Sequence, residues 1–246
     1  MDIRHPDRIL PLTSAQNVRD LGGYATLDGQ RTQWRRFVRS GDMDRMSEAD
    51  QARLLDYGVT LVLDLRMEKE IAVAPNVFSG SDSVDFVVHD FWGRRFDHYR
   101  SRRKDVSHAV KLADLYCSGL EESGFVMRDI MQTIAGAPPG VAFHCRSGKD
   151  RTGLVAALLL SLAGVPTGTV CADFALTAEL LKSPDADAQI DPNQPGYYLR
   201  GCEPETMALT LDFLAREYGG VAAYLQQQGV SASEIQEIRS RLLDQA

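Results

Sequence analysis

Closely spaced cysteines are missing from this 246-residue chain. No CxxC pair occurs, and the four cysteines lie far apart, at Cys117, Cys145, Cys171 and Cys202. Structural zinc sites need clustered ligands, and a disulfide framework needs many cysteines in a short chain. The scattered pattern disfavours both kinds of site, so a reducing cytoplasm is the simplest compartment for this protein.

Long hydrophobic runs are missing as well. The longest one covers residues 153–165 and is shorter than the roughly 20 apolar residues that cross a bilayer, so we expect a buried helix there. The charged N-terminal segment has no continuous apolar stretch of the kind found in a secretory signal. The sequence therefore predicts no stable insertion into a membrane.

Positive charge is in short supply, because 27 Lys and Arg stand against 34 Asp and Glu and leave a net charge of −7 at pH 7. This balance argues against nucleic acid as a partner. Residues 94–104 are a local exception, with six Lys or Arg among 11 residues. We interpret that segment as a solvated face of the protein, and the alternative is a contact surface for an anionic substrate or an anionic surface.

Repeats, low-complexity tracts and linker-like stretches are absent, so we expect residues 1–246 to form a single domain. Runs rich in β-branched and aromatic residues predict strands at residues 59–65, 84–91 and 140–145. Helical patterns separate them, at residues 47–58 and 106–135, and three more helices are expected at 168–182, 205–218 and 233–243. The alternation predicts an α/β fold with a central, mostly parallel sheet flanked by helices.

The segment HCRSGKDRTG, residues 144–153, concentrates reactive chemistry between two apolar runs. We expect a strand that ends at Cys145, a loop, and a helix that begins near Arg151, which places helix N–H groups and a partial positive charge where an anion can bind. The dipole and the guanidinium of Arg151 both favour a nucleophilic thiolate at Cys145. Arg151 can hold two phosphoryl oxygens, and the Thr152 hydroxyl is expected to donate to the Cys145 sulfur.

A nucleotide-binding P-loop is excluded on two counts. That motif requires GxxxxGK followed by Ser or Thr, whereas Asp150 follows Lys149 here. The preceding glycine, Gly140, lies eight residues before Gly148 instead of five.

The stretch HCRSGKDRT matches HCx5R[ST], and the chain resembles the bacterial tyrosine phosphatase family of the cysteine-dependent protein tyrosine phosphatase superfamily. Segments NVRDLGGY, FVRSGDMDRMSEAD, LVLDLRMEKE and DFALTAEL extend the resemblance in the same order along the chain. It implies a protein tyrosine phosphatase-like domain, a phosphocysteine on Cys145, and neither metal nor cofactor. The implied phosphate-binding residues are Arg146, Ser147, Gly148, Lys149, Asp150, Arg151 and Thr152. A mycobacterial member of the family is exported, so export without a signal peptide stays open.

The general acid is the open question, because no WPD-like tripeptide occurs. Three carboxylates are candidates. Asp150 is closest in sequence, although it can equally cap the helix or orient Arg151. Asp64 and Asp90 each end a predicted strand, and Asp64 can instead pair with Arg66 or hold the N-terminal NVRD segment.

Other polar residues have a structural interpretation beside a functional one. Lys149 adds charge next to the phosphate, as in phosphoinositide phosphatases, or it points to solvent or pairs with a neighbouring Asp. Asn17, Arg19 and Asp20 order the phosphate loop from behind, or belong to a structural turn at Gly22-Gly23. Arg39 and Asp42 likewise order the phosphate loop, or they form a buried ion pair at a corner between strand and loop.

The expected function is phosphomonoester hydrolysis on protein phosphotyrosine, extended to phosphoserine, phosphothreonine and phosphoinositides. The partners are then phosphorylated substrates. A catalytically weak phosphate-binding module is the alternative, although it gains nothing from a reactive thiol. A rhodanese-like sulfur carrier also places a cysteine at a strand end, but Arg151 and Thr152 fit phosphoryl transfer better.

Overall fold

A five-stranded sheet forms the centre of the computed structural model, which describes residues 3–93, 103, 105–181 and 196–243. Its spatial order is β1-β2-β5-β3-β4; β1 is antiparallel to β2, and the other neighbours are parallel. The strands are β1 Arg19–Asp20, β2 Phe37–Ser40, β3 Leu61–Asp64, β4 Asp85–Val88 and β5 Val141–His144. The α/β fold with a mostly parallel sheet is as predicted.

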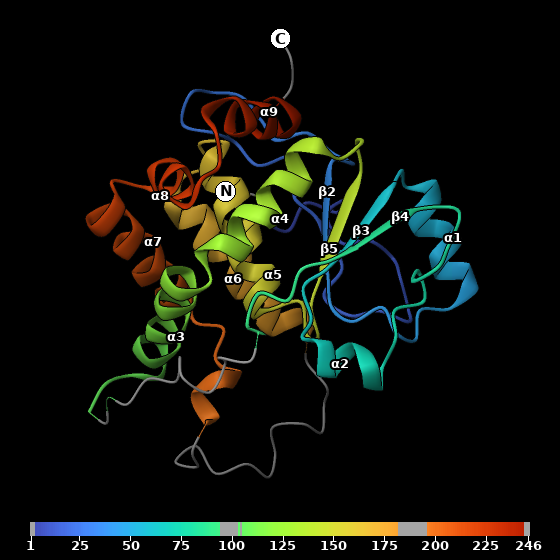
Figure 1. Ribbon diagram of the computed structural model, residues 1–246, viewed down its shortest axis with the longest axis horizontal. Coiled ribbons are helices and arrows are strands. Elements are labelled where there is room, and N and C mark those ends of the chain that lie inside the picture. Colours follow the sequence, from blue (N-terminus) through green and yellow to red (C-terminus); the bar gives the residue numbers. More distant parts are fainter. Residues whose placement is uncertain (1–2, 94–102, 104, 182–195, 244–246) are drawn as a thin grey trace.

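Helices cover both faces of this sheet (Figure 1). On one side lies α1, and on the other lie α4, α5 and α6, with α3, α7 and α8 outside them and α9 above. The helices are α1 Glu48–Asp56, α2 Glu68–Val73, α3 His108–Glu122, α4 Gly124–Gly136, α5 Asp150–Leu162, α6 Thr167–Leu180, α7 Pro204–Tyr218, α8 Val221–Gln228 and α9 Ala232–Leu242, with a 3-10 turn, η2, at Tyr197–Arg200.

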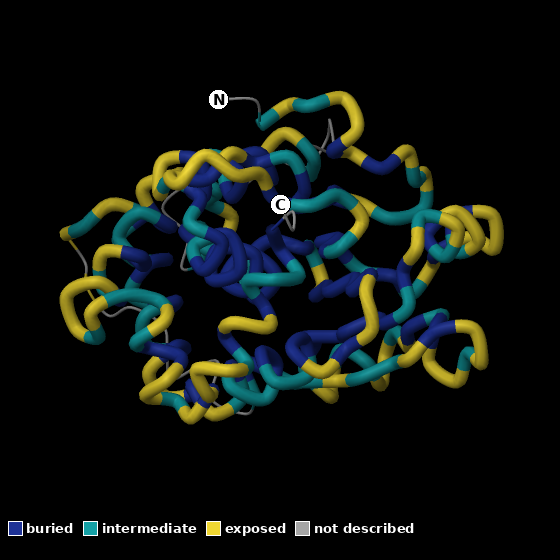
Figure 2. The backbone as a smooth tube through the Cα atoms, turned by 90° about the horizontal axis from the view of Figure 1, so that it is seen from above, coloured by how far each residue is buried: buried dark blue, intermediate teal, exposed yellow. Residues whose placement is uncertain are grey.

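Side chains along each strand point alternately to the two faces of the sheet, and they divide the core into two apolar clusters. In β3, Leu61 and Leu63 pack with the α4 and α5 side, whereas Val62 packs with Leu54 of α1. Successive strand residues point to opposite faces, so a sheet covered on both sides needs continuous apolar runs. Figure 2 shows the buried central chain surrounded by exposed peripheral turns. Helix α5 is buried along almost its whole length, which confirms the buried helix expected from the apolar run.

The predicted helix over residues 106–135 was wrong in one respect, because it is two helices that meet at Ser123. The backbone of Ser123 leaves the helical conformation, with φ −109° and ψ 21°. A Cβ on Gly124 would lie 2.1 Å from Oε1 of Gln228 in α8. The break therefore lets α8 approach the start of α4 closely.

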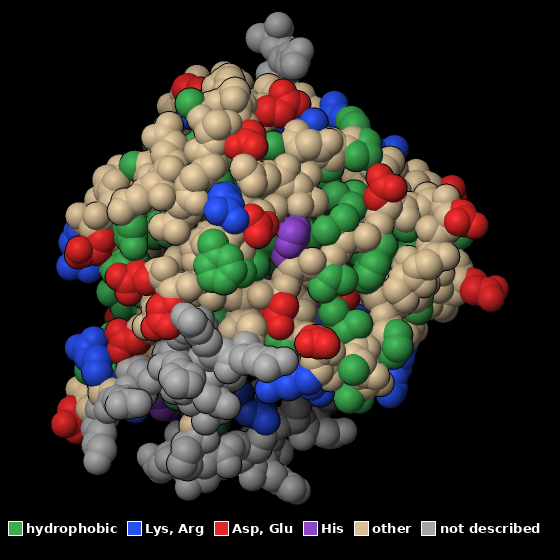
Figure 3. All heavy atoms as spheres, in the orientation of Figure 1, with side chains coloured by type: hydrophobic (Ala, Val, Ile, Leu, Met, Phe, Trp, Pro, Cys, Tyr) green, Lys and Arg blue, Asp and Glu red, His purple; other side chains and the backbone are tan. Residues whose placement is uncertain are grey.

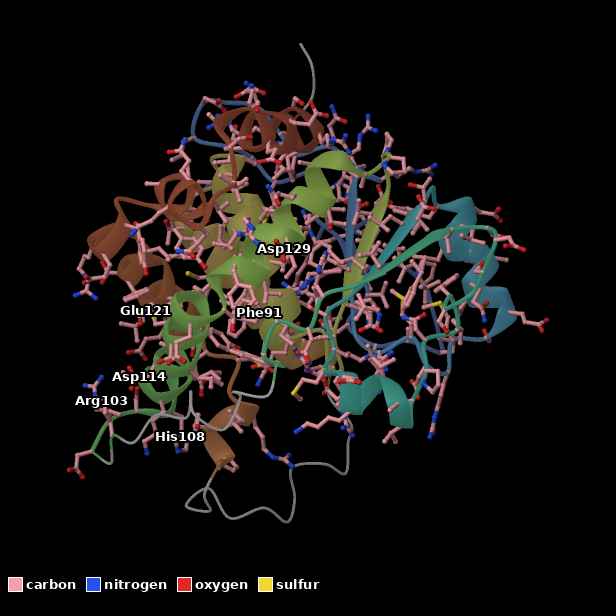
Figure 4. All side chains as sticks on the ribbon, viewed as in Figure 1. Phe91, Arg103, His108, Asp114, Glu121 and Asp129 are labelled. Atoms are coloured by element: carbon pink, nitrogen blue, oxygen red, sulfur yellow. The ribbon has the colours of Figure 1, made fainter. Side chains whose placement is uncertain are left out.

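The strand predicted at residues 84–91 ends early, at Val88. Phe91 and Trp92 leave the sheet and are buried in the larger apolar cluster, where Phe91 lies between α3 and the sheet (Figure 4). The basic segment 94–104 lies outside the described residues except for Arg103, whose guanidinium is 3.5 Å from the carboxylate of Asp114 on α3. No helix in the described parts of the chain has the length and apolar character that a bilayer crossing requires.

The carboxyl ends of the three central strands meet at one edge of the sheet. The pairing register sets His144 of β5 opposite both Ser40 of β2 and Asp64 of β3. The segments that follow these strands therefore converge, and they lie at the lower edge of the sheet next to α2 (Figure 1). Open α/β sheets bind their ligands at this kind of edge.

Candidate active site

The loop between β5 and α5 begins with Cys145, whose side chain is 1% exposed. Gly148 sits in the left-handed region at φ +68°, and a Cβ there would lie 2.5 Å from the carbonyl oxygen of Ser40. Only glycine fits that position, because an L side chain would be strained and would also collide with β2. The loop is thus closely packed against the end of the neighbouring strand. It ends at Lys149, and α5 begins at Asp150.

Arg151, in the first turn of α5, forms a two-pronged ion pair with Glu70 of α2. One terminal nitrogen binds Glu70 Oε2, and the other lies 3.1 Å from Oε1. Burial alone would lower the pKa of Arg151, but the nearby Cys145 and Glu70 raise it above its ordinary value. The Nε atom is buried and has no hydrogen-bond partner among the described residues.

Thr152 does not make the hydrogen bond expected of it. Its Oγ1 is buried and finds no partner in the described parts of the chain, the sulfur of Cys145 included. Two donors beside the loop, Arg151 Nε and Thr152 Oγ1, therefore make no hydrogen bond to any residue that the structure describes. Buried polar groups in native proteins nearly always have a partner, so such a pair points to a ligand that accepts hydrogen bonds.

Asp64 is fully buried, and both of its carboxylate oxygens accept hydrogen bonds. Its two oxygens accept from the Arg66 side chain at 2.7 to 3.1 Å, and His144 Nε2 lies 3.4 Å away. Burial would raise the pKa of Asp64, but His144 and Arg66 outweigh it and hold the pKa well below its usual range. The pairing of Asp64 with Arg66, one of the three expectations for this residue, is therefore present.

His144 lies behind Cys145 in a polar network. Its Nε2 is 2.7 Å from Nδ2 of Asn76, and its Nδ1 is 3.2 Å from the backbone oxygen of Cys145. Asp64 and Asn76 both face Nε2 of the ring, and the Cys145 carbonyl faces Nδ1. These contacts fix the end of β5, from which the loop starts.

Asp90 lies just beyond the end of β4, half-buried. It accepts hydrogen bonds from the backbone of Gly93, at 2.7 Å, and of Glu68, at 3.4 Å. Burial raises the pKa of Asp90 above its ordinary value, against the opposing charge of Arg151. This carboxyl group therefore lies within electrostatic range of the phosphate loop.

Asp150 and Lys149 turn toward α3 and η2. The Tyr116 hydroxyl of α3 donates to Asp150 Oδ1 at 2.7 Å, and Lys149 Nζ is 3.4 Å from the same oxygen. Lys149 is 4% exposed and also donates to the Leu199 carbonyl in η2. Of the alternatives for Lys149, a pairing with the neighbouring aspartate is the one that is present.

Of the two interpretations of Arg39 and Asp42, the ion pair between them was wrong. Arg39 binds Asp173 of α6 at 2.5 Å, and Asp42 binds Arg66 at 2.8 Å. The alternation of β2 explains the outcome, because Arg39 shares a face with Phe37, which packs on the α5 and α6 side of the sheet. Asp42 follows the strand end and lies on the α2 side.

The back of the loop is held by the N-terminal segment, as one interpretation of Asn17 predicted. Asn17 Nδ2 donates to the carbonyls of Ser147 and Gly148, at 3.0 and 2.9 Å. Arg39 donates to the Gly148 carbonyl at 2.8 Å. The loop is thus supported both from the segment just before β1 and from β2.

A groove of about 820 Å³ opens beside the loop, between α2 and the segments around residues 14–16 and 42–45. Its acidic residues are paired, Asp42 with Arg66, Asp44 with Arg45 and Glu70 with Arg151. Arg146 and Lys69 also line it, and no described acidic residue forms a salt bridge with either. Figure 3 shows basic and acidic side chains close together over α2 at the lower edge.

Three residues at the site carried no distinct signal of their own in the sequence: Glu70, Tyr116 and Asp173. Glu70 and Asp173 lie in segments that support the family resemblance, but nothing marked them individually. Tyr116 lies in a helix 34 residues before Asp150. Only the fold brings it to the loop.

Comparisons with known proteins agree over nearly the whole chain. A profile of the tyrosine phosphatase family matches residues 10–244. A tyrosine-protein phosphatase of Nostoc commune is 33% identical over 222 residues, covering 84% of this chain and 74% of the relative. Triple specificity protein phosphatase PtpB of Mycobacterium tuberculosis is 25% identical, covering 94% of this chain and 98% of the relative. The crystal structure of P. aeruginosa TpbA in complex with pTyr shares 16% identity over 96% of both chains, with a TM-score of 0.36.

Proposed function

This chain belongs to the tyrosine phosphatase family and is a cysteine-dependent enzyme, and on that premise we propose that it hydrolyses protein phosphotyrosine through a phosphocysteine on Cys145. One observation carries the proposal. Cys145 lies at the base of a loop that leads into α5, beside the unpartnered donors Arg151 Nε and Thr152 Oγ1. A nucleophile and unused donors around one small space suit a phosphoryl group.

The reaction has two displacements at phosphorus. The Cys145 sulfur attacks, the bond to the tyrosyl oxygen breaks, and a proton from an acid neutralises the leaving oxygen. Water then attacks the phosphocysteine, the same carboxylate removes its proton, and inorganic phosphate leaves with the sulfur restored as thiolate. Arg151 Nε and the backbone N–H groups of residues 146–151 hold the phosphoryl oxygens throughout.

Asp150 is our assignment for the acid, with Asp90 as the competitor. Asp64 is better suited to structure, because its carboxylate is enclosed and held ionised by Arg66 and His144. Asp150 is next to Arg151 and its carboxyl is part-exposed. Asp90 has a pKa raised by burial, a property that suits a proton donor.

Activity on phosphoserine, phosphothreonine and phosphoinositides is the broader part of the proposal. Its support is similarity to a relative named for triple specificity, together with the lysine in the loop. The contacts of Lys149 with Leu199 and Asp150 direct its charge toward η2. We therefore rank phosphotyrosine first among the substrates.

The substrate we favour is a peptide segment instead of a free small phosphate ester. The groove of about 820 Å³ next to Arg146 has room for residues that flank a phosphotyrosine. Two exposed cations of the groove, Arg146 and Lys69, form no salt bridge with a described acidic residue and favour acidic flanking residues.

The first test is hydrolysis of para-nitrophenyl phosphate and of a phosphotyrosyl peptide in excess chelator. We expect wild-type turnover that chelator leaves unchanged and that Cys145→Ser abolishes while still binding phosphate. Phosphate binding without turnover by the wild type would instead support the binding module.

The same assay ranks the acids through Asp150→Asn and Asp90→Asn, each tested with a good and a poor leaving group. Loss of the true acid slows the poor leaving group far more than the good one, because only the poor one needs protonation. Equal losses with both substrates would contradict the assignment of that residue.

A further inference from the structure

Behind the phosphate loop lies a buried polar cluster that no step of the reaction uses. Asn17 and Arg19 come from the N-terminal segment and β1, Arg39 from β2 and Asp173 from α6. None of these four side chains is more than 3% exposed. Burying two guanidinium groups is costly unless they are paired, so the cluster calls for an explanation beyond packing.

The cluster donates hydrogen bonds to two carbonyl oxygens of the loop. Asn17 Nδ2 donates to Ser147 and Gly148 at 3.0 and 2.9 Å, and Arg39 donates to Gly148 at 2.8 Å. In a trans peptide the carbonyl and the following N–H point in opposite directions. With these carbonyls turned to the cluster, the N–H groups of Gly148 and Lys149 are turned to the opposite side of the loop. They are among the donors that our proposed function assigns to phosphate.

The orientation of the Asn17 amide is itself fixed. Its Oδ1 accepts a hydrogen bond from Arg19, so its Nδ2 must face the loop. Arg19 is held in turn by Asp173, whose carboxylate also accepts from Arg39 and from the Tyr24 hydroxyl. Each member of the cluster therefore restricts the next one.

The cluster also brings charge to the back of the loop. Two guanidinium groups face one carboxylate, which leaves one positive charge beneath an anion-binding loop. Burial and the neighbouring Arg19 lower the pKa of Arg39 to about 10, so it stays protonated at neutral pH. Burial would raise the pKa of Asp173, but the two arginines outweigh it and keep the group ionised.

We propose that Asn17 and Arg39 are positioning residues, anchored by Arg19 and Asp173, that fix the loop with its N–H groups turned toward the substrate phosphate. This inference rests on the proposed function of the loop. It assigns a role in catalysis to residues that touch neither substrate nor nucleophile. In the absence of the cluster, two buried carbonyls would lack partners, and the peptides that carry them would be free to turn.

Asn17→Asp is the sharpest variant, because it keeps the shape and the acceptor for Arg19 but replaces the donor to both carbonyls with a carboxylate oxygen. Asp also tolerates the left-handed conformation of this residue, φ 59°. Inorganic phosphate binding is measured by calorimetry in the Cys145→Ser background, where no turnover occurs. We expect affinity to fall about tenfold or more, the effect of leaving buried acceptors unpaired.

Arg39→Lys is the second variant, since it keeps the positive charge but cannot bind Asp173 and Gly148 together. The matched control is Tyr57→Phe, which removes a 2.7 Å hydrogen bond to Asp20 of β1 without touching the loop. In active enzyme, both cluster variants should raise the phosphate inhibition constant and KM in parallel. The control should lower thermal stability and leave both constants unchanged.

Outcomes separate this inference from the proposed function. Wild-type turnover with unchanged phosphate affinity in Asn17→Asp and Arg39→Lys overturns the positioning role while the phosphatase stands. A lack of phosphate binding by Cys145→Ser with its cluster intact contradicts the proposed function instead. If Asn17→Asp fails to fold, Arg39→Lys alone decides, by the same two constants.

Discussion

Arg151 illustrates how single residues are prepared for the reaction before substrate arrives. Its two terminal nitrogens are occupied by Glu70, and its Nε is unpartnered among the described residues. The ion pair fixes the plane of the guanidinium, so that the remaining donors keep one direction. Preorganised donors cost no rearrangement when charge develops on the phosphoryl oxygens.

Replacing Glu70 with Gln tests this arrangement. The amide can accept from only one nitrogen of Arg151, and its own NH2 group repels the other, so the guanidinium loses its fixed plane. We expect kcat/KM to fall by up to about 100-fold, as small misplacements of a binding group do. Steady-state kinetics with para-nitrophenyl phosphate measure it; unchanged kinetics would show that Arg151 is positioned by α5 alone.

Among the elements, those near the reactive loop were the most predictable. The motif HCRSGKDRTG set the strand end, the loop and the helix start within a residue of their positions, because an apolar run on each side indicates a buried element and the polar, glycine-containing stretch between them indicates a loop. Pairings across the sheet were not predictable: Arg39 binds Asp173 and not Asp42, since the partner lies on a helix 134 residues away. Helix α2, which supplies Glu70, is too short for its periodicity to be recognised.

The contact between the loop and β2 is the next prediction, tested by Gly148→Ala. The added Cβ would lie 2.5 Å from the Ser40 carbonyl oxygen in a left-handed backbone. We expect the free energy of unfolding to fall by about 1–3 kcal/mol, because the left-handed backbone is strained by a side chain. We also expect kcat/KM to fall, because the loop must shift away from Ser40.

Gly168→Ala in α6 is its control, because nothing lies within 4 Å of the added Cβ. Thermal melts and kinetics of both variants give the answer. If both variants kept the same Tm and the same kcat/KM, the loop would tolerate this movement.

The link between α1 and the N-terminal segment predicts a pH effect. Asp50 accepts hydrogen bonds from Ser14 and Thr13, chiefly from the Ser14 hydroxyl, which holds its pKa below the ordinary value. A depressed folded-state pKa adds stability above the unfolded pKa of about 4, and this stability is lost as pH falls toward the folded pKa. Asp50→Asn should therefore flatten the fall of Tm below about pH 4; an unchanged slope in scanning calorimetry would contradict this.

At the scale of the whole molecule, the segment around residues 32–33 pairs with the C-terminal end of α9. The backbone N–H of Gln33 donates to the Leu242 carbonyl at 2.8 Å, and Thr32 forms an antiparallel bridge with Leu243. Figure 1 shows the N-terminal chain passing beside α9. Ile238 of α9 packs in the same apolar cluster as Phe143 and Leu154 near the active loop. This continuity is the physical basis for expecting one domain over residues 1–246, which stays a prediction.

Cooperative unfolding tests that prediction, through Ile238→Ala far from the loop. Truncating this fully buried side chain should cost about 2–5 kcal/mol. If the chain is one cooperative unit, the loss lowers the midpoints of helical circular dichroism and of phosphatase activity by the same amount, and the calorimetric and van't Hoff enthalpies agree. Gln236→Ala on the exposed face of α9 should leave both midpoints in place. A variant in which helicity melts while activity survives would show that the C-terminal helices unfold separately from the phosphate loop.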